Sequence, residues 1–407
     1  MLPVMQSSEK VQAIPEALSV YINNVVYAMK HRGDRVITLS LGEAFFDVPD
    51  FGFTGEMFRR GCHYSESRGI PELRKLICGY YSENYGVPVN PNNEIIISAG
   101  SKPLIYMAFQ AVLNPGDEVL ILEPAWLSYP EEVKLADGVP VFIPYDCPVK
   151  NFADYFTPKT RMLVLSNPNN PAGKVYTSDE MRELYVMCRE KGICILADEA
   201  YSDFVIDGSF ASLGKIVPDK DGIIIVNSLS KNLGISGWRI GYAISSPEVI
   251  FSILKLNQHL ITCAPTLLQL YIAEHFGEIV SSTLLQAQEV VRKRAEVEQY
   301  IAASGLDVLP GSATFYIFVD IGNWKYSSLD LALYLLAKYR IAVVPGSAYG
   351  ESTGHFIRIG VGAEPMKDIQ SAIDIISRVT AANEFDDALV ARELQAVGMN
   401  RFEEAGR

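Results

Sequence analysis

The sequence is poor in metal-binding and redox patterns. Its 407 residues include six cysteines and five histidines, but no C-x-x-C pair and no H-E-x-x-H motif. The first absence excludes a zinc ribbon and a thioredoxin-type site, and the second excludes a zincin-type metal centre. We therefore expect no metal in the function of this protein.

Positive charge is also scarce. Lysine and arginine total 35 against 48 for aspartate and glutamate, which gives a formal net charge of −13. Binding to a nucleic acid needs many cations to neutralise phosphates, so no nucleic-acid partner is expected. The simplest interpretation of the acidic balance is solubility.

Long apolar runs are missing as well. The run at residues 331–337 makes only about two helical turns, whereas a membrane helix needs about 18 apolar residues or more. Residues 1–10 lead into mixed sequence rather than into the apolar core of a signal peptide. Several cysteines lie in apolar or helical runs and are interpreted as buried free thiols. We expect no membrane association and a reducing, cytoplasmic location.

Three common catalytic motifs are absent. A Walker A loop fails because Pro168 stands where a glycine is needed, five positions before Gly173. Neither the G-x-G-x-x-G fingerprint of dinucleotide-binding folds nor the G-x-S-x-G elbow of hydrolases occurs. A P-loop nucleotidase, a Rossmann dehydrogenase and an α/β-hydrolase are thereby excluded.

What is present is an alternation of short apolar runs and helical stretches. The predicted strands are residues 94–98, 118–122, 139–143, 162–166, 193–197 and 222–227. The predicted helices in this part are residues 15–30, 71–85, 102–112 and 179–191. Continuous apolar strands that are separated by helices predict an α/β fold with a mainly parallel sheet covered on both faces.

The last third of the sequence has a different pattern. Strands and helices follow one another at lower density, which predicts a smaller α+β unit. The expected helices are residues 281–304, 329–339 and 365–379, and the expected strands are residues 315–321 and 356–360. The charged tail that follows is either a loosely docked amphipathic helix or a frayed end.

Two polar segments directly follow predicted strands. The sequence S-N-P-N-N-P-A-G at residues 166–173 has two Asn-Pro pairs that restrict the backbone to an irregular turn. An ordinary polar loop is the alternative. The sequence D-E-A-Y at residues 198–201 lies at the carboxyl end of a strand, where open α/β sheets collect ligands. A helix cap is the alternative there.

Two further segments contain a lysine beside glycines or serines. Lys231 ends the sequence S-L-S-K after a strand and precedes the Gly-rich turn at residues 237–242. A lysine on a solvated surface is the usual case, but a desolvated lysine has a lowered pKa and attacks carbonyl groups. The sequence G-S-K at residues 100–102 joins a strand to a helix, whose free N–H groups suit a phosphate. By itself this junction is weak support for a phosphate site.

In their order and spacing, the four segments resemble the class I/II aminotransferases, which are fold-type-I enzymes that depend on pyridoxal 5′-phosphate (PLP). The resemblance runs from about Leu41 to about Ala363. It implies a seven-stranded-type, mainly parallel sheet with a smaller α+β domain. The implied divisions are an N-terminal segment at 1–51 that joins the small domain, a large PLP-binding domain at 52–290, a small domain at 291–382 and a charged tail at 383–407.

The resemblance also implies how the cofactor ring is held. Lys231 matches the lysine to which PLP is covalently attached, and Asp198 matches the aspartate that pairs with the pyridine nitrogen. Asn170 and Tyr201 match the pair that hydrogen-bonds the ring 3′-oxygen. Trp126 matches the aromatic residue that stacks on the ring, although a core tryptophan is the alternative.

The cofactor phosphate has its own matches. Ser228 and Arg239 match phosphate ligands, since a guanidinium group suits phosphate oxygens. Gly100, Ser101 and Lys102 match the turn that encloses the phosphate. Tyr64 matches a tyrosine that reaches the phosphate of the neighbouring subunit, which implies a homodimer with composite sites.

For the substrate, Arg358 matches the arginine that binds the α-carboxylate, and Gly42 matches a glycine whose backbone also touches it. Phe45 stands where the family often has an acid at the entrance of the substrate pocket. No second arginine is assigned to a side-chain carboxylate, which favours a neutral or aromatic amino donor over aspartate.

The predicted activity is ping-pong transamination between an amino acid and a 2-oxo acid. A β- or γ-eliminating lyase or a cyclising synthase on the same fold is the main alternative, because the fold does not determine the reaction. A regulator that retains the fold is a third possibility. The acidic balance and the absence of a DNA-binding domain before Leu41 disfavour it.

Overall fold

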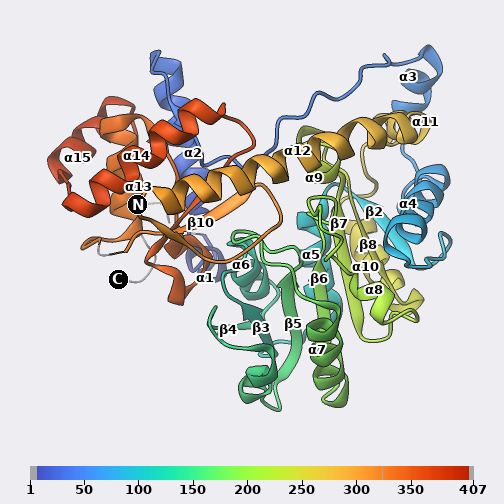
Figure 1. The fold of residues 1–407 in the computed structure, drawn as a ribbon. Helices are drawn as coiled ribbons and strands as arrows, with labels where there is room; N and C mark the ends of the chain where they lie inside the picture. Colours follow the sequence, from blue (N-terminus) through green and yellow to red (C-terminus); the bar gives the residue numbers. More distant parts are fainter. Residues whose placement is uncertain (1–6, 323, 403–407) are drawn as a thin grey trace, which may run out of the picture.

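A computed structural model describes residues 7–322 and 324–402. Its largest element is a seven-stranded sheet, shown in the lower right of Figure 1. All neighbouring strands in it are parallel except at β8, which is antiparallel to both of its neighbours. In spatial order the strands are β2 (Ile95–Ser98), β8 (Gly241–Ser245), β7 (Ile223–Ser228), β6 (Cys194–Asp198), β5 (Thr160–Ser166), β3 (Glu118–Leu122) and β4 (Val139–Ile143). The predicted α/β class and mainly parallel sheet are confirmed.

The sheet is covered on both faces because its strands are apolar at almost every position. In β7, Ile225 packs into one hydrophobic core, whereas Ile224 and Val226 pack into the core on the other side. Helices supply most of the other apolar groups of both cores. They include α4 (Pro71–Tyr85), α5 (Ser101–Val112), α6 (Ser128–Leu135), α7 (Ser178–Glu190), α8 (Leu213–Ile216), α10 (Pro247–Leu260) and α11 (Thr266–Glu274).

The N-terminal and C-terminal parts of the chain together build a further core, separate from the two cores of the large sheet. The N-terminal strand β1 (Ile37–Thr38) pairs in parallel with β11 (Ile341–Ala342), and α2 (Leu18–Arg32) packs into the same core as the C-terminal elements. The adjoining antiparallel sheet has the order β12 (Val344–Pro345), β13 (Phe356–Gly360), β10 (Tyr316–Asp320) and β9 (Asp307–Val308). The helices here are α13 (Ser328–Tyr334), η3 (Leu335–Tyr339), α14 (Met366–Ala382) and α15 (Asp387–Ala396).

The long helix α12 (Phe276–Ala303) connects the two parts, and Figure 1 shows it running from the region of α11 to that of α14. The remaining short elements are α1 (Glu9–Gln12), α3 (Gly55–Gly61), η1 (Val149–Tyr155), α9 (Leu229–Asn232), η2 (Ser236–Trp238), η4 (Gly346–Tyr349) and η5 (Glu351–Thr353). No helix among residues 7–322 and 324–402 is long and apolar enough to cross a membrane.

Three details differ from the sequence-based expectations. The expected turn at residues 237–242 extends into strand β8, whose position between β2 and β7 comes from tertiary pairing. The helix expected at 281–304 begins at Phe276, and the one expected at 329–339 ends in a π-helical turn. Of the two alternatives for the tail, residues 387–396 are a helix that buries Val390 and Leu394.

Candidate active site

The carboxyl ends of three neighbouring strands meet at one edge of the large sheet. Ser166 ends β5, Asp198 ends β6 and Ser228 ends β7. At the same edge, β2 leads through Gly100 into α5. Because parallel strands deliver their carboxyl ends to one edge, residues that are far apart in the sequence are gathered in one place.

This edge borders a cavity of about 280 Å³, called the catalytic pocket below because most of the expected site residues line it. Of the residues predicted from the sequence, the pocket is lined by Gly42, Ser101, Lys102, Trp126, Asn170, Asp198, Tyr201, Ser228, Lys231, Arg239 and Arg358. Gly100 lies just behind the lining, since a Cβ there would come within 2.5 Å of Nη2 of Arg239. Tyr64 is 85% exposed and lies outside the lining, as does Phe45, which is 63% exposed.

Lys231 lies on α9, directly after β7, and its Nζ donates a hydrogen bond to the carbonyl oxygen of Gly42. Burial lowers the pKa of the Lys231 ammonium to about 8. The charges of Arg358 and Arg239 contribute to this lowering of the pKa, and those of Glu43 and Asp198 oppose it. Near neutral pH, a far larger fraction of this amine is therefore neutral and nucleophilic than in an exposed lysine.

Asp198 is held by two donors. Its Oδ2 accepts a hydrogen bond of 2.6 Å from the Tyr129 hydroxyl, and its Oδ1 accepts one of 3.1 Å from the Ala200 N–H. Burial raises the pKa of this carboxyl group, while these hydrogen bonds and the charge of Lys231 oppose the rise. The carboxylate is thus fixed in orientation and would gain from a cationic partner in the pocket.

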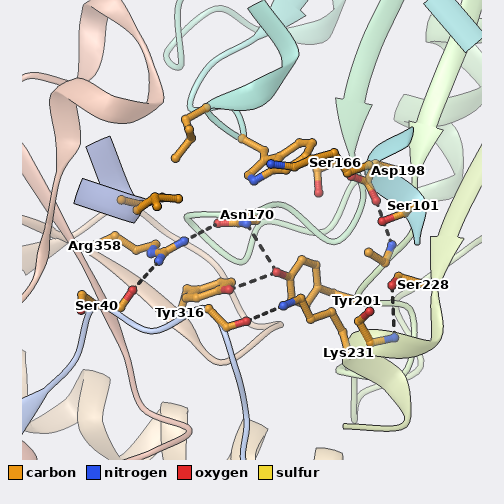
Figure 2. A pocket seen from close by; sticks show the side chains of 18 of the residues that line it. Ser40, Ser101, Ser166, Asn170, Asp198, Tyr201, Ser228, Lys231, Tyr316 and Arg358 are labelled. Atoms are coloured by element: carbon orange, nitrogen blue, oxygen red, sulfur yellow. Dashed lines mark hydrogen bonds between the residues drawn. The ribbon is translucent and has the colours of Figure 1, made fainter. Parts of the chain in front are cut away.

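A chain of hydrogen bonds crosses the pocket, and Figure 2 shows Asn170 between Arg358 and Tyr201. Nδ2 of Asn170 lies 3.4 Å from the Tyr201 hydroxyl, which lies 3.1 Å from the Tyr316 hydroxyl. Nη1 of Arg358 donates to Oδ1 of Asn170 at 3.3 Å, and Nη2 donates to the Ser40 carbonyl oxygen at 2.9 Å. These hydrogen bonds thereby connect Asn170 and Tyr201, which are expected at the ring oxygen, with Arg358, which is expected at the substrate carboxylate.

Arg358 keeps an unused donor. It is only 4% exposed, and its Nε has no hydrogen-bond partner in the described part of the chain. Its guanidinium carbon lies 4.2 Å from the ring centre of Tyr316. A guanidinium group that lines the pocket and is oriented by Asn170 and Ser40 is suited to bind a carboxylate.

The opposite side of the pocket collects donors for an anion. The first turn of α5 begins at Gly100, whose φ of 96° suits glycine, and no side chain caps this helix end. Around it are Ser228, Ser230 and Arg239, and Arg239 Nη1 donates to the Ser236 carbonyl oxygen at 3.0 Å. Free helical N–H groups, hydroxyls and a guanidinium group together are the donors that a phosphate needs.

The sequence analysis missed several residues of the site. Tyr129 and Tyr316 each bond to a predicted site residue, and Ser40, Ser166 and Ser230 also line the pocket. Tyr316 comes from β10 and reaches Tyr201 across 115 positions of sequence. Ser166 and Ser230 lie within the polar segments already singled out, whereas Ser40 and Tyr129 lie in none of them and are brought to the site by the packing of distant elements.

The comparisons agree with this geometry. The family described as "Aminotransferase class I and II" matches residues 55–376, so the chain belongs to the class I and II aminotransferases. It is a transaminase of fold type I, a family that is generally PLP-dependent. The predicted family and activity are confirmed.

Among its relatives is the "Probable aspartate/prephenate aminotransferase" of Aquifex aeolicus, which is 33% identical over 79% of this chain and 86% of that protein. The "Aspartate/prephenate aminotransferase" of Thermus thermophilus is 31% identical over 91% of this chain and 98% of that protein. A solved structure of the Thermus thermophilus aspartate aminotransferase with maleate has a TM-score of 0.84 and 29% identity, and covers 92% of this chain and all of that one.

Proposed function

We propose that this transaminase uses PLP in the catalytic pocket and moves an amino group from an amino acid to a 2-oxo acid by a ping-pong mechanism. The observation that carries the proposal is the placement of Lys231 and Asp198 in one pocket with an anion-binding helix end. A lysine, a buried carboxylate and a phosphate-type cradle are the three partners that PLP requires.

The residues present fit this cofactor. Ser101, Ser228 and Arg239 would hold its phosphate, with the Gly100 turn and Lys102 beside them. Asp198 would face the pyridine nitrogen, Asn170 and Tyr201 would face the ring oxygen, and Trp126 would stack on the ring. When bound, PLP accepts the amino group and spreads the negative charge that forms at the substrate Cα.

Lys231 is the proposed catalytic base and acid. Acting as a base, its amine takes the proton from the substrate Cα. Acting as an acid, the resulting ammonium group then gives that proton back to the reacting molecule. The lowered pKa of about 8 supports this role, because a catalytic group should gain and lose its proton near the working pH. The Gly42 carbonyl oxygen holds the Lys231 Nζ within the pocket.

Arg358 is the proposed substrate clamp. The guanidinium group of Arg358, which lines the pocket, would bind the α-carboxylate, while Ser40 and Asn170 keep that group in place. Gly42 would contribute a backbone contact to the same carboxylate. Fixing the carboxylate also fixes the direction of the Cα–H bond that breaks.

We also propose a homodimer in which Tyr64 of each subunit contacts the phosphate in the other. The 85% exposure of Tyr64 supports this proposal, because the side chain is free to reach a second copy.

We also propose that the chain is divided into an N-terminal segment at 1–51, a large domain at 52–290, a small domain at 291–382 and a tail at 383–407. The shared core of Leu18, Ile22 and the C-terminal elements supports the first of them. The cytoplasmic location stays a prediction.

A half-reaction tests the proposed function. PLP-loaded enzyme is mixed with an amino acid but no acceptor. We expect one equivalent of 2-oxo acid per site, loss of the cofactor's visible absorbance, and its return on adding a second 2-oxo acid. Release of ammonia over many turnovers would instead indicate the lyase alternative. Release of neither product would refute catalysis on amino acids.

A further inference from the structure

Two loops from the two parts of the molecule lie against each other beside the catalytic pocket. One loop, residues 167–173, follows β5 of the large sheet, and the other, residues 311–315, leads into β10 of the smaller sheet. The N–H groups of Ser312 and Ala313 both donate to the Gly173 carbonyl oxygen at 3.0 Å. We call this contact the loop seam. Because both loops adjoin residues that line the pocket, the loop seam joins two of its walls.

At the loop seam the two backbones approach too closely for a side chain to stand between them. Gly173 has a φ of 79°, and a Cβ there would lie 2.3 Å from the Ala313 carbonyl oxygen. A Cβ at Gly311 would lie 2.1 Å from the Ala172 carbonyl oxygen. Both distances are far below a van der Waals contact, so these positions require glycine. The relative position of the two loops is therefore set by direct backbone contact.

One buried guanidinium group binds both sides of the loop seam. Arg294 lies on α12, the helix that connects the two parts in Figure 1, and is 1% exposed. Its Nε donates to the Tyr316 carbonyl oxygen at 2.8 Å, and its Nη2 donates to the Ala172 carbonyl oxygen at 3.3 Å. Its Nη1 donates to Oε2 of Glu298 at 2.6 Å. The planar guanidinium group thus holds the loop after β5, the start of β10 and α12 in one geometry.

Both carbonyl groups held by Arg294 lead directly to residues of the proposed site. Ala172 stands two positions after Asn170. Tyr316 belongs to β10, which pairs with β13, the strand of Arg358. The Tyr316 ring centre lies 4.2 Å from the guanidinium carbon of Arg358, whose Nη1 donates to Oδ1 of Asn170 at 3.3 Å. This last hydrogen bond spans the loop seam, so its length and angle depend on how the two loops are held.

We propose that Arg294 is a positioning residue for the substrate clamp. By holding the loop seam, it keeps Arg358 at the separation and angle from Asn170 at which Arg358 binds the α-carboxylate of the amino acid. Arg294 itself lies outside the lining of the catalytic pocket, so it acts through these two residues. The inference rests on the proposed function, because it requires that Arg358 binds that carboxylate.

Stability alone does not call for a guanidinium group at position 294. Taking a charge out of water is costly, and well-packed apolar residues often replace a buried ion pair with little loss of stability. A lysine would supply a single point charge, whereas the Arg294 side chain reaches two carbonyl oxygens and a carboxylate at once. These three directed bonds therefore favour a role in fixing geometry over a role in stability alone.

Phenylalanine and 2-phenylethylamine are matched probes for the test, because they differ only in the α-carboxylate. Single-turnover half-reactions of the PLP-loaded enzyme give an apparent second-order rate constant for each probe. In Arg294→Met we expect this constant to fall about tenfold for phenylalanine. For 2-phenylethylamine it should change by less than about twofold, since that amine has no carboxylate for Arg358 to bind.

Three further variants separate the geometry of the loop seam from the charge of Arg294. Arg294→Lys keeps the charge and one donor group, so it should recover part of the loss. Glu298→Gln is the matched control: its amide oxygen still accepts from Arg294, so neither rate constant should change by more than about twofold. Gly311→Ala leaves Arg294 in place but brings a Cβ to 2.1 Å from the Ala172 carbonyl oxygen, so it should reproduce the selective loss for phenylalanine.

Binding supplies a readout other than turnover. The acid 3-phenylpropanoate keeps a carboxylate for Arg358 and has no amino group that could react. Calorimetry on the PLP-loaded enzyme should show about tenfold weaker binding of this acid in Arg294→Met and in Gly311→Ala, with unchanged affinity for PLP. Glu298→Gln should bind the acid as wild type does. Thermal unfolding of each variant checks that it remains folded.

Equal losses for phenylalanine and 2-phenylethylamine, or wild-type affinity for the acid in the Arg294 variants, would leave Arg294 a structural role only. Either result would overturn the inference and leave transamination intact, as would a loss in Glu298→Gln as large as in Arg294→Met. If Arg294→Met does not fold, Arg294→Lys and Gly311→Ala decide by the same comparison. A wild type that does not prefer phenylalanine to 2-phenylethylamine would also overturn the inference, whereas absence of a half-reaction with any amino acid would refute the proposed function itself.

Discussion

The hydroxyl of Tyr129 donates a 2.6 Å hydrogen bond to Oδ2 of Asp198, although the two residues lie 69 positions apart in the sequence. Both side chains are buried, at 1% and 8% exposed. Asp198 ends a strand of the sheet and Tyr129 lies on α6, so the bond links the sheet to this helix. Tyr129 therefore orients the carboxylate that is proposed to face the cofactor.

Removing the Tyr129 hydroxyl tests whether it orients Asp198 for catalysis. In Tyr129→Phe the buried carboxylate loses its shortest hydrogen bond, so the pKa of Asp198 should rise further. We expect kcat to fall by about tenfold, as for loss of one to two kcal/mol of interaction with a charged group. Steady-state kinetics with saturating PLP measure the change. Unaltered kcat and PLP affinity would show that the bond has no influence on Asp198.

Lys231→Ala should abolish transamination while the protein stays folded. The change removes the proposed nucleophile and proton carrier, and the side chain makes few packing contacts because it faces the pocket. Borohydride treatment followed by peptide mapping should find PLP attached at position 231 in wild type and none in the variant. Turnover near the wild-type rate would refute the assignment of Lys231.

Arg358→Lys should retain PLP but use amino acids poorly. Lysine keeps the positive charge and loses the planar pair of donors that fixes a carboxylate. We expect kcat/KM for the amino donor to fall by the equivalent of roughly 1–3 kcal/mol. An amine without a carboxylate should be almost indifferent to the change. An equal loss for both substrates would mean that Arg358 does not bind the carboxylate, and failure to bind PLP would give it a structural role.

Asp203 gives a prediction for stability. Burial raises the pKa of its carboxyl group to about 6, and the hydroxyls of Tyr80 and Tyr85 bond to the same oxygen. The native state therefore holds its proton to higher pH than the unfolded chain, whose carboxyl group has a pKa of about 4. Because the native state binds more protons, this residue makes the free energy of unfolding fall as pH rises from about 4 to about 6.

Asp203→Asn should remove that dependence. Relative to wild type, the variant should gain stability on the order of 3 kcal/mol between pH 4 and pH 6, since its amide does not ionise. Urea unfolding at several pH values measures the difference. Parallel stability curves for the two proteins would show that Asp203 ionises in the native state as it does in the unfolded chain.

Much of the site was predictable from the sequence because its residues stand at strand ends. Asp198 follows a continuous apolar strand, and Lys231 lies three residues beyond the end of the next one. Parallel strands bring such positions together whatever the rest of the chain does. The order of these segments, and the resemblance that they carry, therefore predicted the family and the residues that line the pocket.

Other features depended on tertiary structure. Strand β8 is recognisable only from its pairing with β2 and β7. Tyr316 reaches Tyr201, and Arg358 reaches Asn170 across 188 positions, because β10 and β13 lie beside the loops that follow β6 and β5.

The sequence by itself determined the chemistry of the strand ends, because an apolar run and the polar residues that follow it are local properties of the chain. Only the tertiary structure decided which buried polar atoms have no partner, such as Oε2 of Glu132. Whether a buried donor or acceptor is satisfied depends on neighbours from several distant segments at once, and hydrogen bonds weaken steeply with small changes of distance and angle. That information arises only when the elements pack.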